Sequence, residues 1–207
     1  NKTQLRDIVV FGSLGFGGTN LLITFAYALI PVGIASTLHF AYPLVTTLIM
    51  VILFHEKLTP IKCIAAVLVV SGMYLLGGGG QVSSMLGVIC ALASSLTYAS
   101  FVVAQERSSM VQLNGFVTNF YIALFTGIFL IPVVLLTGGF SLPSIAAVLA
   151  MAVSSIIQIS AIIFLSKGVQ IMGASKAAFL NLLEPIASVF FGMLFFQEFP
   201  DLVSTVG

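Results

Sequence analysis

Charged side chains are scarce in this sequence. They make up 6% of its 207 residues, whereas 59% of the residues are hydrophobic, and the formal net charge is only +1. Soluble proteins carry about 25% charged residues, so this composition excludes an ordinary soluble domain and predicts a polytopic membrane protein. A nearly neutral chain also argues against a nucleic-acid partner.

Cysteine and histidine are also rare, with two of each. Cys63 and Cys90 both lie in apolar segments, which is typical of buried small side chains and does not suggest a disulfide framework or a cysteine-based metal site. The pair His55 and Glu56 lacks the second histidine of a zinc motif, and no Ser/His/Asp set or pair of intramembrane aspartates is present. These gaps argue against a membrane enzyme, and we expect neither a cofactor nor a metal.

Long apolar runs are abundant instead. Seven stretches of about 20 residues could each cross a hydrocarbon core of about 30 Å as a helix, and short connections containing Gly or Pro separate most of them. Their approximate bounds are Ile8–Ile30, Val32–Phe54, Pro60–Leu76, Met85–Ala104, Phe116–Leu136, Ile145–Ser166 and Met172–Phe196. The predicted fold is an all-α membrane protein, a polytopic helical bundle.

Basic residues give this bundle an orientation. All seven fall on one side of the predicted topology, and they are Lys2, Arg6, Lys57, Lys62, Arg107, Lys167 and Lys176. Because basic loops stay in the cytoplasm, we expect this side to be cytoplasmic and the protein to reside in the cell membrane, either a plasma membrane or a bacterial inner membrane.

One segment of the sequence repeats. Residues Ala35–Glu56 align without a gap with Ala177–Glu198, and the copies share a mid-helix proline (Pro43 and Pro185) and a terminal glutamate. The first copy ends on the basic side and the second on the opposite side, so the copies are inverted. Inverted repeats are typical of secondary transporters.

Equal repeats would each hold five helices. We therefore expect residues 1–76 to be the end of a first repeat, residues 77–84 a Gly-rich linker, and residues 85–207 a second repeat with a truncated last helix. Two further helices are expected before Asn1 and one after Asp201. In this interpretation the sequence is a fragment that carries seven of ten helices.

Three motifs in the first half resemble the EamA-type domain of the drug/metabolite transporter superfamily. They are His55–Pro60, Ile64–Leu68 and Ser71–Leu76. The second half has a similar pattern at Glu184–Pro185 and Gln197–Pro200, but the Lys expected after Glu198 is missing. The resemblance implies ten helices with cytoplasmic ends, a substrate cavity between two inverted halves, and alternating access. It implies export of small organic metabolites such as amino acids or drugs. A nucleotide-sugar-type exchanger and a non-transporting scaffold or receptor are the alternatives.

Polar residues within the apolar stretches are the candidate site. An acidic residue such as Glu184 at the centre of a membrane helix costs roughly 2.5 to 3.5 kcal/mol and usually faces a cavity or a partner. In the repeat, Asn181 corresponds to His39 and Glu184 to Tyr42, and each pair shares a helix face. We predict that these four side chains line one cavity near the midplane, where the prolines bend the helices, and that Glu184 binds a cationic group or a proton.

Three further residues are candidates for substrate binding. Asn20 and Gln158 could supply amides to the cavity, although interhelical hydrogen bonding is at least as good an explanation. Tyr98 lies on the fourth span, where the resemblance implies a cavity-lining helix. The expected partners are a small-molecule substrate, the lipid bilayer, protons as a coupling ion, and a second copy of the chain in a homodimer.

Glycines of the first span have two interpretations. Gly12, Gly15, Gly17 and Gly18 could suggest a nucleotide-binding loop, but no strand precedes them and the stretch is intramembrane. Close packing between helices is the better prediction. The two terminal glutamates of the repeat, Glu56 and Glu198, are predicted to cap loops or act in gating.

Overall fold

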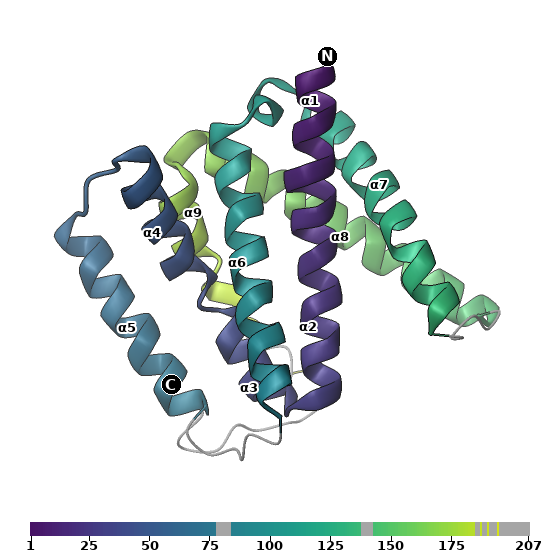
Figure 1. Cartoon of the computed structure of the whole chain (residues 1–207), viewed down its shortest axis with the longest axis horizontal. Coiled ribbons are helices and arrows are strands. Elements are labelled where there is room, and N and C mark those ends of the chain that lie inside the picture. The colour runs from purple at the N-terminus through teal and green to yellow at the C-terminus, as the bar shows by residue number, and fades with distance from the viewer. Residues whose placement is uncertain (78–83, 138–142, 185–186, 188–189, 191–193, 195–207) are drawn as a thin grey trace.

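The computed structural model describes residues 1–77, 84–137, 143–184, 187, 190 and 194, and every regular element in these residues is helical (Figure 1). The predicted all-α class is therefore confirmed. In chain order the elements are α1 (Lys2–Asp7), the π-helical η1 (Ile8–Phe16), α2 (Gly17–Leu29), α3 (Val32–His39), α4 (Tyr42–Phe54), α5 (Pro60–Gly77), α6 (Met85–Arg107), the short 3₁₀ turn η2 (Ser109–Gln112), α7 (Gly115–Leu136), α8 (Ile145–Met172) and α9 (Ala174–Leu180).

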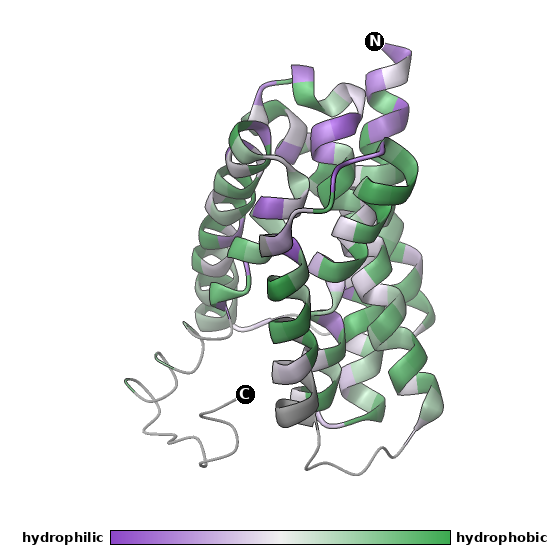
Figure 2. Cartoon of the chain, turned by 90° about the vertical axis from the view of Figure 1, so that its left-hand side faces the viewer, coloured by the Kyte–Doolittle hydropathy of each residue, from purple (hydrophilic) through white to green (hydrophobic). Residues whose placement is uncertain are grey.

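Five helical stretches among the described residues are long and apolar enough to cross a membrane. They are Lys2–Leu29, Val32–Phe54, Met85–Arg107, Gly115–Leu136 and Ile145–Met172, and each overlaps a predicted span. The third predicted span corresponds to α5, which is apolar over Lys62–Gly72. Hydrophobic residues cover the sides of the helices, and hydrophilic residues gather at the end of the bundle that carries the N-terminus (Figure 2).

The boundary between the last two predicted spans differs from the prediction. Instead of stopping near Ser166, α8 continues through Gly168 to Met172, because a glycine inside a helix is tolerated. Gly173 ends it with a φ of 89°, a left-handed conformation that glycine adopts without strain. The last predicted span therefore begins at Ala174, and most of its part beyond Glu184 lies outside the described residues.

Helix α6 is the centre of the bundle. It packs against α2, α3, α4, η1, α8 and α9. Small side chains make this close approach possible, since Ala91, Ser94, Ser95 and Ala99 are all buried on α6. Elements far apart in the sequence are therefore held around one helix.

The ends of the helices fall into two groups. The N-terminus, the turn between α4 and α5, η2 and the start of α9 lie together at one end of the bundle, which we call the basic end because the basic residues of the loops lie there (Figure 1). Helix α4 runs toward this end and α9 runs away from it. The opposite directions are those that an inverted repeat requires, although the repeat itself stays a prediction.

Glycines of the first helical stretch allow close packing, as predicted for three of the four. A Cβ atom added to Gly12 would lie 2.7 Å from Cγ1 of Ile122, and one added to Gly17 would lie 2.9 Å from Cγ2 of Thr126, both on α7. Gly15 lies against Phe101 of α6. Gly18, in contrast, has no such neighbour within 4 Å.

This difference predicts the stability of two matched variants. Gly12→Ala forces its methyl group into Ile122 and should lower the free energy of unfolding by about 1–3 kcal/mol. Gly18→Ala has open space and should be neutral, or stabilising by up to about 1 kcal/mol, because alanine favours the helix. Thermal unfolding of both proteins in detergent tests the prediction, and an equal loss in both would contradict the packing at Gly12.

Candidate functional site

Two helix breaks lie inside the bundle. Helix α3 ends at His39, the chain turns at Phe40 and Ala41, and α4 begins with Pro43 in its first turn. The bend predicted at this proline is confirmed. A similar break follows α9, where the N–H of Leu182 donates to the carbonyl of Phe179 at 3.1 Å. Both breaks fall shortly before a proline of the proposed repeat, and Pro185 itself lies outside the described residues.

A cavity of about 200 Å³ lies beside these breaks. Its walls come from the end of η1, from α2, α3, α4 and α6, and from the segment after α9. The lining residues are Phe16, Thr19, Asn20, Ile23, Tyr27, Ser36, His39, Phe40, Tyr42, Tyr98 and Glu184. The cavity reaches toward Tyr27, which is 41% exposed in the last turn of α2, and α2 ends away from the basic end (Figure 1).

The structure brings five of the seven predicted site residues to this cavity: Asn20, His39, Tyr42, Tyr98 and Glu184. A sixth, Asn181, lies next to the side chain of Tyr42. Gln158 is not among the lining residues and lies on an exposed part of α8. The binding roles of these residues stay predictions.

Three aromatic rings form one wall of the cavity. The ring centroids of His39 and Tyr42 are 5.6 Å apart, those of His39 and Tyr98 5.5 Å, and those of Tyr42 and Tyr98 4.6 Å with an edge-to-face arrangement. His39 Nδ1 is 2.9 Å from the hydroxyl of Ser94, a hydrogen bond that fixes the ring against α6. The wall is therefore a packed aromatic surface on three helices, α3, α4 and α6, with defined ring positions.

The hydroxyl of Tyr42 is deeply buried, and no described residue forms a hydrogen bond of good geometry with it. Its side chain is 1% exposed, and Oη has no partner of good geometry among the described residues, although Asn181 lies beside it. A buried polar group without a partner costs about 1–3 kcal/mol, so native structures rarely retain one without a reason.

Glu184 differs from the other carboxylates that the structure describes. Asp7, Glu56 and Glu106 each lie within ion-pair distance of a lysine or arginine, but no basic side chain of the described segments lies at this distance from Glu184. Its side chain interacts electrostatically with the phenols of Tyr42 and Tyr98, which also line the cavity. Within the described residues, the cavity therefore holds an acidic group without a fixed counterion.

Asn20 has a partly structural role. Its Nδ2 donates to the carbonyl of Phe16 one turn earlier, at 2.9 Å. The neighbouring Thr19 joins α2 to α6, with its hydroxyl 2.8 Å from that of Thr97. These bonds hold the α2 wall of the cavity in place.

Three carboxylates connect different helices at the basic end, and we call these contacts the carboxylate latches. Asp7 on α1 accepts hydrogen bonds from Ser109 of η2, at 3.1 Å from the backbone N and 2.7 Å from Oγ. Glu106 at the end of α6 accepts from the N–H of Ala174 at 2.6 Å. Glu56 accepts from the hydroxyl of Ser175 at 2.7 Å and pairs with Lys62.

Of the three latch carboxylates, Glu56 alone has a role predicted from the sequence, namely loop capping or gating. The partners of Asp7 and Glu106 could not be read from the sequence, because the bonded residues are 102 and 68 positions apart. A carboxylate at the end of an apolar span was the available signal. It identifies a candidate without identifying its partner.

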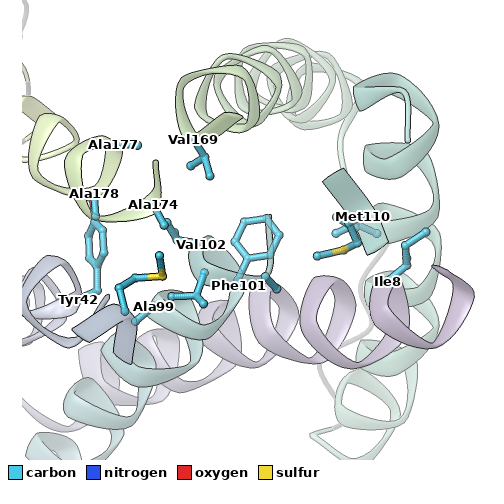
Figure 3. Packing of buried hydrophobic residues seen from close by; sticks show 14 residues of the cluster. Ile8, Tyr42, Ala99, Phe101, Val102, Met110, Val169, Ala174, Ala177 and Ala178 are labelled. Atoms are coloured by element: carbon cyan, nitrogen blue, oxygen red, sulfur yellow. The ribbon is translucent and has the colours of Figure 1, made fainter. Parts of the chain in front are cut away.

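An apolar cluster lies between the cavity and the latches. Figure 3 shows buried side chains running from Tyr42 past Ala99 and Phe101 to Met110 and Ile8. Residues of α9 and α8, among them Ala174, Ala177, Ala178 and Val169, close it from the other side. The cavity is thus separated from the basic end by packed side chains and, beyond them, by the latches.

The latch at Glu56 should make stability depend on pH. Partial burial alone would raise the pKa of Glu56, but hydrogen bonds from Lys62 and Ser175 and the charges of Lys62 and Arg107 outweigh it, so the pKa lies below the usual 4.5. A carboxyl with a lowered pKa stabilises the fold above pH 4.5, and this contribution is lost as the pH falls through the folded-state pKa.

Glu56→Gln should therefore lower the Tm by about 2–4 °C at pH 7, roughly the effect of 1 kcal/mol in a chain of this size. The difference from the unaltered protein should shrink as the pH falls below 4.5. Thermal unfolding in detergent at pH 7, 5 and 3.5 measures it. A difference that does not change with pH would mean that the charge of Glu56 does not hold the latch.

Comparison with known proteins identifies the family of the chain and a solved structure with the same fold. The model of the EamA-like transporter family matches residues 1–78 and 85–207. The uncharacterized transporter sll1319 of Synechocystis sp. is 28% identical over 208 residues, which are 95% of this chain and 63% of that protein. The uncharacterized transporter YcbK of Bacillus subtilis is 26% identical over 170 residues, 73% of this chain and 52% of that protein.

A solved crystal structure has the same fold. It superposes with a TM-score of 0.81 at 19% identity, over 96% of this chain and 70% of the solved chain. The chain spans less than two thirds of the length of both curated relatives.

Proposed function

Because the chain belongs to the EamA-like transporter family, we propose that its protein is a secondary transporter that exports small organic metabolites by alternating access. The observation that carries this proposal is the polar cavity among the helices. It is lined by intramembrane polar residues and separated from the basic end by the apolar cluster and the latches.

A transport cycle needs this separation to be reversible. The latches join α1 to η2, α6 to α9, and the turn after α4 to α9, so parting them would free the start of α9. The carboxylates form hydrogen bonds rather than bury apolar area, and such contacts can be exchanged for water at moderate cost. In the proposed cycle they break when the cavity opens to the basic end.

The basic end faces the cytoplasm in this proposal, because all seven basic residues belong to that side of the predicted topology. The arrangement described above is then the state that is closed to the cytoplasm. Helices outside this chain would complete two inverted five-helix halves around the cavity.

Flux measurements on the full-length protein test the function. Purified protein is reconstituted into liposomes, and uptake of labelled amino acids, amines and nucleotide sugars is compared with uptake by empty liposomes. We expect saturable flux of at least one small metabolite. If folded, inserted protein moves none of them, the scaffold or receptor interpretation replaces the transporter.

A further inference from the structure

We infer that the cavity selects small organic ammonium ions that carry N–H donors. The role of such an ion as transported substrate rests on the function proposed above, but its binding can be tested separately. Three independent features of the cavity lead to this chemical class: its charge, its aromatic wall, and an unsatisfied hydroxyl.

The charge of the cavity is set by Glu184. Among the described residues that line it, Glu184 is the acidic one, and none is a lysine or arginine. A carboxylate within a membrane protein interior is stabilised strongly by an opposite charge, and no side chain of the described segments supplies that charge. A cationic ligand would supply it.

The aromatic wall adds a second preference for cations. Glu184 lies near enough to Tyr42 and Tyr98 to interact with both phenols, and His39 packs against both rings. An ammonium group within about 6 Å of an aromatic face is attracted by the ring quadrupole, most strongly where water is excluded. A cation held by Glu184 would therefore also contact aromatic side chains.

The Tyr42 hydroxyl distinguishes between kinds of cation. Tyr42 lines the cavity from α4, and its buried Oη lies beside Asn181 without a hydrogen bond of good geometry in the described residues. A primary or secondary ammonium ion can donate one N–H to Glu184 and another to this oxygen. A quaternary ammonium ion has no N–H and would leave the hydroxyl unsatisfied.

The volume of the cavity, as the described residues enclose it, favours a small ligand. Pockets for drug-sized molecules measure roughly 300–1,000 Å³, and this cavity measures about 200 Å³. A ligand smaller than a typical drug fits this volume. The charge of the cavity disfavours a nucleotide sugar, since its phosphates would meet the carboxylate of Glu184.

A matched ligand series tests the inference on the full-length protein in detergent. The probes are phenethylamine, 2-phenylethanol, phenylacetate and N,N,N-trimethylphenethylammonium, which share a phenyl group and differ in charge and N–H donors. Calorimetry at pH 7 should show phenethylamine binding at least about tenfold more tightly than the alcohol. Phenylacetate should bind most weakly, and the trimethyl compound should be about fivefold weaker than the amine for lack of a hydrogen bond.

Single substitutions test which side chains cause this order of ligand affinities. Tyr42→Phe should weaken phenethylamine about fivefold and leave the trimethyl compound unchanged. It should also raise the melting temperature of the ligand-free protein, since it removes an unsatisfied buried hydroxyl. Tyr121→Phe is the matched control, because Tyr121 lies on α7 outside the cavity, against Phe120 and Phe125.

The outcomes separate this inference from the proposed function. Equal or tighter binding of the alcohol or of phenylacetate would overturn the preference for cations, and equal loss of both cations in Tyr42→Phe would overturn the role of the hydroxyl. Flux of neutral or anionic metabolites in liposomes without binding of amines would sustain transport and refute the inference. Binding of amines without any flux would support the inference and refute transport.

Discussion

Glu184→Gln is expected to reduce amine flux at least about 30-fold while the protein stays folded and inserted. The substitution keeps the size of the side chain and removes the one negative charge that the described lining of the cavity carries. Removing one partner of a desolvated charge pair typically costs 2–5 kcal/mol, which corresponds to this factor or more. Initial uptake rates in liposomes at saturating and limiting substrate measure the effect.

A second measurement on the same variant separates two roles of the carboxylate. If Glu184 binds the substrate cation, Glu184→Gln should lose both accumulation driven by a pH gradient and exchange of labelled for unlabelled amine. If Glu184 carries only the coupling proton, exchange should persist while accumulation is lost. Unchanged flux in both assays would remove Glu184 from the site. Unfolding temperature and detergent gel filtration serve as controls for folding.

The sequence predicted the fold well because the membrane restricts what a chain can do. Apolar runs of about 20 residues must become helices when no water is present to satisfy their backbone, so span positions follow from composition alone. The helix break at His39 was also readable, since Pro43 cannot continue the hydrogen bonding of the preceding turn. The C-terminal end of α8 could not be predicted, because Gly168 is equally compatible with a helix or a loop.

Candidate site residues could be predicted where the cost of burying them was high. Glu184, His39 and Tyr42 are polar groups in apolar stretches, and the proposed repeat pairs Glu184 with Tyr42 and Asn181 with His39. Gln158 met the same criterion but lies on an exposed part of α8. Ser154 and Ser155 lie one turn earlier on the same side of α8, so a polar helix face in the sequence did not identify a face that points into the cavity.

The latches could not be predicted from the sequence for a different reason. Each joins residues from distant parts of the chain, as with Glu56 and Ser175, which are 119 positions apart. No local pattern relates such pairs, and they become neighbours only once α9 packs against α4 and α6. The contacts that close the basic end are therefore harder to predict from the sequence than the positions of the membrane-spanning helices.

Weakening two latches together should open the basic end. In Glu56→Gln/Glu106→Gln both acceptors keep their shape but lose their charge, and a neutral hydrogen bond has about half the strength of a charge-assisted one. Because both latches hold the start of α9, at Ser175 and Ala174, their losses should combine. The population open to the basic end should rise at least about tenfold.

A cysteine at position 105 reports this opening. Gln105 is 7% exposed on α6, and its amide atoms lack hydrogen-bond partners among the described residues, so it lies in the closed region near Glu106. In a background without the native cysteines (Cys63→Ala/Cys90→Ala), Gln105→Cys should react slowly with a water-soluble maleimide. Adding the double variant should accelerate the reaction at least about tenfold.

A cysteine at position 57 is the matched control for access to the same end. Lys57 is exposed in the turn between α4 and α5, so Lys57→Cys should react rapidly with or without the double variant. Equal acceleration at positions 57 and 105 would indicate general unfolding. Unchanged slow labelling at position 105 would show that the apolar cluster alone keeps the basic end closed, since the cluster buries the large side chains of Phe101 and Met50 regardless of the latches.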